Sequence, residues 1–243
     1  MKMKKEKIAI SIDSGVLSLL DSKVDGSMLR SRSQAIEYFL GKGLQEDSVT
    51  IAVLLLRGGQ QGIALKQIHG KSLLQHQVEF FVSSGIKTLY LVTQSPSREL
   101  RESLVGLPVE IVEANKRGNA GALSELSEKI ISNFVVMSGD TLNHFDLRRM
   151  VSKHRALGKL ATMGLMTREK ASAYGSVVLD GDFIVDFREK TGSSHIVNAG
   201  IYVFKPEIFE LLNGSLEKDV FPKLAKLKEL VGHFTYGEYE HYG

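Results

Sequence analysis

Short apolar runs alternate with amphipathic segments from residue 51 to residue 140, and this alternation is the strongest constraint on the fold. The apolar runs are rich in β-branched residues, and the segments between them carry apolar residues at helical spacing. Strands that alternate with helices in this way predict a parallel sheet covered by helices on both faces. We expect strands at about 51–57, 87–93, 109–113 and 133–138, and helices at about 72–84, 97–105 and 119–131.

Beyond residue 140 the expected strands are 160–167, 175–180, 183–188 and 195–204, and the expected helices are 146–157, 206–212 and 217–228. The predicted fold class is therefore α/β, with a Rossmann-like mixed sheet. In such sheets ligands bind beyond the carboxyl ends of the strands. Three pairs fall at these ends and mark a candidate ligand site: Gly58-Gly59, Arg117-Gly118 and Gly139-Asp140.

Composition excludes several classes of protein. The chain has 243 residues and contains no cysteine, so it has neither a disulfide framework nor a thiolate metal site. A reducing compartment follows, and we expect a cytoplasmic protein. No apolar run reaches the roughly 18 residues that a membrane span needs, so no membrane partner is expected.

The first 42 residues form a distinct segment, predicted as strand, helix, turn, helix. Residues 7–12 alternate strictly, which places Ile8, Ile10 and Ile12 on one face of a strand. A helix follows, and the S-x-x-Q form of residues 31–34 predicts a capping box at the start of a second helix. Gly41 and Gly43 are expected to end that helix.

About 40 residues are too few for an independent core, and a lone strand leaves both of its edges unpaired. Pairing with a second copy solves both problems, so we expect a homodimer or a dimer of dimers. A polar, glycine-rich linker follows, and the predicted domains are 1–44 and 50–243. The whole net charge of +3 lies in residues 1–42, which makes nucleic acid a candidate partner for this end.

The first segment resembles the ribbon-helix-helix DNA-binding family in the order of its elements and in "SRSQAIEYFL" at the second helix. The resemblance implies that a two-stranded ribbon enters the major groove of double-stranded DNA, while the second helix holds a phosphate. The implied DNA-binding residues are Lys7, Ala9 and Ser11 in the groove, and Arg32 and Ser33 at the phosphate. The alternative is a dimerisation arm that does not contact DNA.

Residues 50–243 resemble the sugar-phosphate nucleotidyltransferases, which join a sugar 1-phosphate to a nucleoside triphosphate and release pyrophosphate. These enzymes have a Rossmann-like sheet of the GT-A-like type. The motifs that carry the resemblance occur in the family's order: "LLLRGG", "HGKSLLQHQVEFFVSSGIKTLYLV", "RGNAGAL", "VVMSGDTL", "YGSVVLD", "FREK", "VNAGIYVF" and "EKDVFPKL".

The resemblance implies a role for each matching residue. Asp140 would hold Mg²⁺ between two phosphate groups. Glu189 and Lys190 would bind sugar hydroxyls and the sugar phosphate, and Gly175 and Asn198 would contact the sugar. The residues expected against the nucleotide are small, because the backbone must approach it closely: Gly58, Gly59, Gly118, Ala120 and Gly121.

Two regions depart from the family's pattern. The loop between Gly58 and Lys71 is shorter than the family's and lacks its triphosphate-binding arginine and its catalytic lysine. Lys66 or Arg57 could substitute. The family also supplies a second metal-binding aspartate near the end of the fold, where this chain reads "YGEYEHYG" and has Glu238, Glu240 or His241 near that place. Histidine is a poor Mg²⁺ ligand, and Glu240 could serve if the register slips.

Three functions remain open at this point. The motifs implied at the sugar match the family, whereas the loop implied at the triphosphate lacks its cations. Together with a DNA-binding ribbon, this pattern favours a dimeric transcriptional regulator that senses a sugar phosphate or nucleotide sugar. In that case the transferase domain is degenerate and needs no cofactor. The alternative is an active sugar-1-phosphate nucleotidyltransferase that uses Lys66 or Arg57 and Mg²⁺, dimerised by its ribbon. A third possibility is a binding or scaffold protein with neither activity.

Overall fold

The computed structural model describes residues 8–24, 29–46, 49–169, 171–191 and 194–242. The chain divides into two compact units, Met1–Ser48 and Val49–Gly243. No helix in the described ranges is both long enough and apolar enough to cross a membrane.

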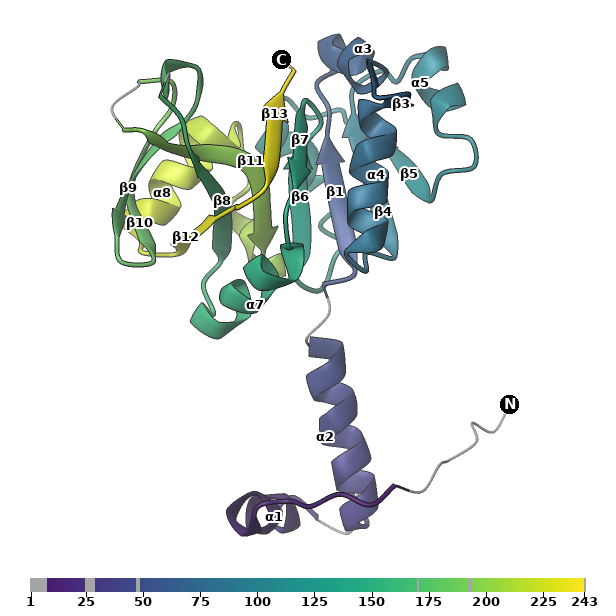
Figure 1. Cartoon of the computed structure of the whole chain (residues 1–243), viewed down its shortest axis with the longest axis vertical. Helices are drawn as coiled ribbons and strands as arrows, with labels where there is room; N and C mark the ends of the chain where they lie inside the picture. Colours follow the sequence, from purple (N-terminus) through teal and green to yellow (C-terminus); the bar gives the residue numbers. More distant parts are fainter. Residues whose placement is uncertain (1–7, 25–28, 47–48, 170, 192–193, 243) are drawn as a thin grey trace. The chain divides into compact units, whose positions relative to one another are not determined.

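The second unit is built on a nine-stranded sheet (Figure 1). In spatial order its strands are β5 (Val109–Glu113), β4 (Thr88–Thr93), β1 (Ile51–Leu55), β6 (Phe134–Ser138), β11 (Ile196–Phe204), β8 (Ala161–Thr167), β12 (Leu230–Phe234), β10 (Phe183–Arg188) and β9 (Ser176–Asp180). The first four are parallel, whereas β11 runs antiparallel to both of its neighbours, β6 and β8. The predicted α/β class with a mixed sheet is confirmed.

Helices cover both faces of this sheet because alternate strand residues point to opposite sides. Val53 packs into one apolar cluster, and its neighbours Ala52 and Leu54 pack into the other. The α-helices of this unit are α3 (Gln61–Ala64), α4 (Leu73–Ser83), α5 (Arg98–Ser103), α6 (Asn119–Ser124), α7 (Leu147–Leu157) and α8 (Phe221–Lys226). Other helical turns are η1 (Gly58–Gln60), η2 (Ala171–Ala173), η3 (Pro206–Leu211) and the π-helical η4 (Leu216–Val220).

Strands β5 and β10 have the predicted bounds, but several short elements were not predicted. They include α3, β12 and two antiparallel strand pairs: β2 (Gln67–Ile68) with β3 (Lys71–Ser72), and β7 (Thr141–His144) with β13 (Glu238–His241). The predicted helix 119–131 ends early, at Ser124. Beyond it, Glu125 and Leu126 donate to carbonyls three residues back, which forms turns instead of an α-helix.

The first unit contains α1 (Ser14–Asp21) and α2 (Arg32–Glu46). The predicted strand is absent from residues 8–13, which have no regular structure, and Lys7 lies outside the described residues. A strand is defined by hydrogen bonds to a partner, and the described part of this single chain provides none. Helix α2 also continues past Gly41 and Gly43, since glycine inside a helix costs only about 1 kcal/mol.

The side chains predicted to contact DNA are not arranged for it in this unit. The Arg32 guanidinium donates two hydrogen bonds of 2.6 Å to the Asp21 carboxylate at the end of α1. Ala9 and Ser11 are exposed on the irregular segment, and Ser33 is exposed in the first turn of α2. In this single chain the Arg32 guanidinium is therefore engaged in an exposed ion pair within the unit.

His154 provides a test of the second unit's stability. It is fully buried on α7, its Nδ1 lies 2.9 Å from the Thr162 hydroxyl, and burial lowers its pKa to about 4. Because the unfolded chain takes up a proton near pH 6.5, the stability should be complete above that pH. It should fall as the pH drops towards 4, by about 3 kcal/mol from this group.

Urea denaturation at pH 7 and pH 4 measures this loss. His154→Asn keeps a hydrogen-bonding group near Thr162 but cannot titrate, so its stability should fall less between the two pH values. His69→Asn, on the exposed turn between β2 and β3, is the matched control. Equal losses in wild type and His154→Asn would contradict the assignment.

Candidate active site

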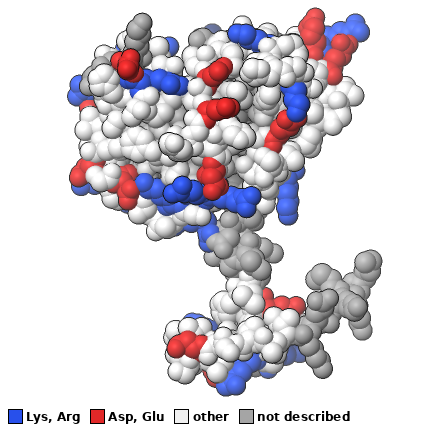
Figure 2. All heavy atoms as spheres, in the orientation of Figure 1, with Lys and Arg blue, Asp and Glu red and all other residues white. Residues whose placement is uncertain are grey.

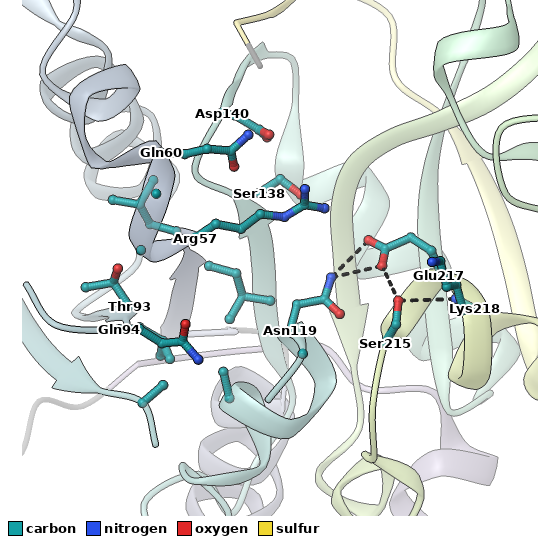
Figure 3. Close-up of a pocket in the computed structure, with 18 residues that line it drawn as sticks. Arg57, Gln60, Thr93, Gln94, Asn119, Ser138, Asp140, Ser215, Glu217 and Lys218 are labelled. Carbon is teal, nitrogen blue, oxygen red and sulfur yellow. Dashed lines mark hydrogen bonds between the residues drawn. The ribbon is translucent and has the colours of Figure 1, made fainter. Parts of the chain in front are cut away.

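A cavity of about 470 Å³ opens beyond the carboxyl ends of the parallel strands (Figure 3). Its walls come from the turns after β1, β4, β5 and β6, from the start of α6 and from η4. It is the place where parallel α/β sheets bind ligands. Both charge signs line it, since Arg57 and Lys218 face a cavity that Asp140 and Glu217 also border.

The turn after β1 forms the first wall. Arg57, Gly58, Gly59 and Gln60 line the cavity, and Gln61 fixes the turn to the segment after β4. The Gln61 amide donates to the Gln94 and Ser95 carbonyls, and its oxygen accepts from the Ser97 backbone at 2.8 Å. The shortened loop is thus a compact corner that directs Arg57 across the cavity (Figure 3).

The opposite wall joins α6 to η4. Gly118 has a φ of +76°, and a Cβ added there would lie 2.0 Å from the Gly214 carbonyl oxygen. Only glycine allows this approach. Next to it the Asn119 amide donates to both Glu217 carboxylate oxygens at 3.0 and 2.9 Å, and its oxygen accepts from the Leu216 backbone. This network positions Glu217 and Lys218 at the cavity.

Asp140 lies in the turn between β6 and β7. Gly139 donates to the Leu55 carbonyl at 2.8 Å, which ties this turn to β1. The buried Gln77 of α4 donates to the carbonyls of Ser138 and Thr141 on either side of Asp140. The backbone of the turn that carries Asp140 is therefore fixed from two directions.

The Asp140 carboxylate has a basic neighbour from the end of the fold. Its Oδ2 lies 3.7 Å from His241 Nε2 on β13, and the two side chains are 17% and 29% exposed. Burial disfavours the charged form of Asp140. The neighbouring His241 imidazole, with the charge of Arg57, outweighs burial and holds the pKa of Asp140 below its usual value.

The residues implied at the sugar are not among the residues that line this cavity: Gly175 directly precedes β9, Glu189 and Lys190 follow β10, and Asn198 is on β11. Gly175 accepts a backbone hydrogen bond from Asn198 at 2.9 Å, and a Cβ on Gly175 would lie 3.0 Å from the Glu189 carboxylate. Burial, followed by the charge of Glu217, raises the pKa of Glu189, and Arg57 and Lys218 act on it in the opposite direction. Charged residues that line the cavity, Glu217, Arg57 and Lys218, therefore act electrostatically on the Glu189 carboxylate.

The two candidate loop cations end up in different places. Arg57 lines the cavity, whereas the Lys66 ammonium lies 4.8 Å from the centre of the Tyr242 ring and is not among the lining residues. Gly58, Gly59, Gly118 and Asp140 line the cavity, while Ala120 and Gly121 are buried in α6. Further polar residues, which the sequence motifs did not assign to the site, also line the cavity, including Thr93, Gln94, Asn119, Ser215, Glu217 and Lys218. Glu217 and Lys218 open the motif "EKDVFPKL".

Charge is mixed on one face of the second unit. On the face drawn in Figure 2, acidic and basic side chains are interspersed instead of forming a field of one sign.

Residues 64–230 match the nucleotidyl transferase family. The chain is 30% identical over 183 residues to a putative mannose-1-phosphate guanyltransferase of Sulfolobus acidocaldarius, which covers 71% of this chain and 51% of that protein. It is 33% identical over 183 residues to the mannose-1-phosphate guanylyltransferase catalytic subunit beta of Drosophila pseudoobscura pseudoobscura, which covers 68% and 49%. The chain thus spans about half the length of the curated relatives it matches.

Solved structures share the fold at lower identity. HddC from Yersinia pseudotuberculosis matches with a TM-score of 0.69 and 21% identity, over 79% of this chain and 93% of that chain. A UDP-glucose pyrophosphorylase complexed with UDP-glucose matches with a TM-score of 0.66 and 19% identity, over 79% and 92%.

These comparisons overturn the prediction of a DNA-binding transcriptional regulator. The relatives carry the names of nucleotidyltransferases, and a ribbon-helix-helix module is not supported. The sequence reading failed because it treated the short loop as stripped of cations, whereas Arg57 lies in the cavity. In the first unit, Arg32 is paired with Asp21.

Proposed function

Because this chain belongs to the nucleotidyl transferase family, we propose that it is an active sugar-1-phosphate nucleotidyltransferase. The placement of Arg57 is the observation that carries this proposal. Transfer at phosphorus depends mainly on positioning and on neutralising charge. The structure brings two cations to one cavity although the family's loop is shortened. Mannose 1-phosphate and GTP are the first substrates to test, because the relatives are named for that reaction.

In the proposed reaction a phosphate oxygen of the sugar 1-phosphate attacks the α-phosphorus of the nucleoside triphosphate. A new phosphorus–oxygen bond forms, the bond from the α-phosphorus to the oxygen that bridges to the β-phosphate breaks, and pyrophosphate leaves. The products are a nucleoside diphosphate sugar and pyrophosphate, and no oxidant or reductant is needed.

Each wall has a proposed task in this reaction. Arg57 and Lys218 neutralise phosphate oxygens from opposite sides, as a cationic pair does at a transferring phosphoryl group. Gly58, Gly59 and Gly118 allow the backbone to approach the nucleotide. The residues at the start of β9, after β10 and on β11 bind the sugar 1-phosphate: Gly175, Glu189, Lys190 and Asn198.

The donor set beside Asp140 does not fit the Mg²⁺ that the family resemblance implies. Mg²⁺ prefers oxygen ligands in near-octahedral geometry, and Asp140 supplies one carboxylate. The neighbouring side chain from the end of the fold is the imidazole of His241, not a second carboxylate. No catalytic step is therefore assigned to Mg²⁺ in this site.

Pyrophosphate release tests the proposal. Wild-type protein would be mixed with each pairing of four nucleoside triphosphates and a panel of sugar 1-phosphates, with Mg²⁺ or Mn²⁺ present. Release that requires both substrates is the expected result, and it should be greatest for one pairing. Release from the triphosphate alone would indicate hydrolysis instead and would contradict the proposal.

We also propose that residues 1–44 and 50–243 are separate modules and that the chain self-associates through the first of them. This unit exposes large apolar side chains, including Ile8 at 75%, Ile10 at 54% and Leu19 at 69%. Among its described residues only Leu29 and Ala35 are buried hydrophobics. A second copy would cover these side chains and could pair with the irregular segment 8–13.

Ile10→Lys should reduce the mass in solution to that of the monomer, because it places a charge within the proposed apolar contact. Light scattering after size-exclusion chromatography measures the mass. Ser11→Lys adds the same charge at the next exposed residue and is the matched control, which should keep the wild-type mass. A monomeric wild type, or an Ile10→Lys variant of unchanged mass, would rule out this contact.

A further inference from the structure

The end of the fold places an imidazole beside the cavity carboxylate. Strand β13 pairs antiparallel with β7, with His241 opposite Thr141, and Tyr242 donates its backbone N–H to the Asp140 carbonyl at 2.9 Å. Figure 1 shows the two strands side by side. The register of this pair therefore fixes His241 next to Asp140, with 3.7 Å between His241 Nε2 and Asp140 Oδ2.

Side chains outside the pair also hold β13 in position. Arg168 donates to the Tyr239 carbonyl at 3.1 Å, and its guanidinium lies 5.0 Å from the Tyr239 ring. The Tyr174 ring packs edge-on against the His241 imidazole, with 5.7 Å between the ring centres. The position of the imidazole is thus determined by several contacts and not by a free strand end.

The acidic neighbour on the same strand is engaged elsewhere. Consecutive strand residues point to opposite sides, so Glu240 cannot share the side on which His241 meets Asp140. Its carboxylate accepts a hydrogen bond from the Tyr242 hydroxyl. The residue at the cavity carboxylate is therefore a nitrogen donor.

Building on the proposed function, we propose that Asp140 and His241 form a mixed oxygen–nitrogen cation site that selects a divalent transition metal, such as Mn²⁺, over Mg²⁺. A neutral imidazole binds first-row transition metals well, whereas Mg²⁺ takes oxygen almost throughout. Within the described residues no group of three or more His, Asp or Glu side chains could hold a metal alone. Water and substrate phosphate oxygens complete the coordination.

Metal binding is measured on the full-length protein without substrate. The electron paramagnetic resonance signal of free Mn²⁺ falls when the ion binds, which gives an affinity that does not depend on activity. Mg²⁺ is then added as a competitor. Wild-type protein should retain Mn²⁺ against about a tenfold excess of Mg²⁺, and Mn²⁺ should broaden the His241 imidazole resonances before those of the other histidines.

Two variants and a control define the ligand. His241→Ala should weaken Mn²⁺ binding by about tenfold or more, because a ligand is lost. His241→Asp restores two carboxylates and should let Mg²⁺ displace Mn²⁺ readily. Glu240→Gln changes the adjacent residue on the other side of β13, and its Mn²⁺ affinity and Mg²⁺ competition should match wild type.

The proposal is overturned if the wild-type protein does not bind Mn²⁺, or if His241→Ala binds Mn²⁺ with the wild-type affinity. It is also overturned if Mg²⁺ displaces Mn²⁺ from the wild type as readily as it does from His241→Asp. Failure of the proposed function looks different. In that case Mn²⁺ is retained and depends on His241, while no pairing of substrates releases pyrophosphate. Pyrophosphate release together with a metal preference that does not depend on His241 would reject only the present inference.

Discussion

Arg57→Ala should lower kcat/KM for nucleotidyl transfer by about a thousandfold, the loss seen when one main cation or hydrogen-bond donor is removed from a transferring phosphoryl group. Arg57 extends across the cavity from the end of β1, and Lys218 faces it from η4 (Figure 3). Without Arg57, one side of the triphosphate would be left without a cation. Steady-state pyrophosphate release measures the loss.

Two further variants separate charge from position. Arg57→Lys keeps the charge but loses the planar fork of donors, so its rate should lie between those of wild type and Arg57→Ala. Lys66→Ala is the matched control, since Lys66 packs on Tyr242 and does not line the cavity. A Lys66→Ala variant that loses as much activity as Arg57→Ala would show that the loop moves Lys66 into the site.

Gly118→Ala should disrupt the cavity itself. The added methyl group would meet the Gly214 carbonyl oxygen at 2.0 Å, at a φ of +76° that only glycine adopts easily. The start of α6 and η4 would be forced apart, and the contact between Asn119 and Glu217 would be lost. We expect a loss of about 3 kcal/mol in the free energy of unfolding, which lowers Tm by roughly 6–12 °C in a unit of this size.

Nucleotide binding should fall with it, because the same wall carries Lys218. Differential scanning calorimetry and titration with GTP measure the two effects. Gly62→Ala is the control: it lies on α3, where an added Cβ meets nothing within 4 Å, so Tm should stay the same or rise slightly. A Gly118→Ala variant with the Tm and GTP affinity of wild type would contradict the close approach at Gly214.

The sheet could be predicted because its signals are local. Strands β5 (VEIVE) and β10 (FIVDFR) are short runs rich in β-branched and aromatic residues, each preceded by a glycine-containing turn, and their predicted bounds match the structure. Strand β13 escaped prediction because "EYEH" is polar and forms a strand only by pairing with β7, almost a hundred residues earlier in the chain. The placement of His241 at Asp140 depends on that same distant pairing.

The cavity was only partly predictable for a related reason. Of the residues that the motifs pointed to, Gly58, Gly59, Gly118 and Asp140 line the cavity, because their positions follow from strand ends, and their roles in binding stay predictions. Motif matching could not choose between Arg57 and Lys66, since the choice depends on how Gln61 anchors the short loop to residues 94–97. The strand at residues 7–12 was predicted from strict alternation, but a strand also needs a hydrogen-bonded partner, which the described part of a single chain does not supply.

The central claim is that the short loop still supports nucleotidyl transfer. The most direct measurement is ³¹P nuclear magnetic resonance of wild-type protein with GTP, mannose 1-phosphate and Mn²⁺, followed over time beside Arg57→Ala. The account predicts that the resonances of both substrates decline together while those of a nucleoside diphosphate sugar and pyrophosphate grow in equal amounts, and that Arg57→Ala shows almost no change. Unchanged substrate resonances in the wild type, for this pair and for every other triphosphate and sugar 1-phosphate tried, would contradict it.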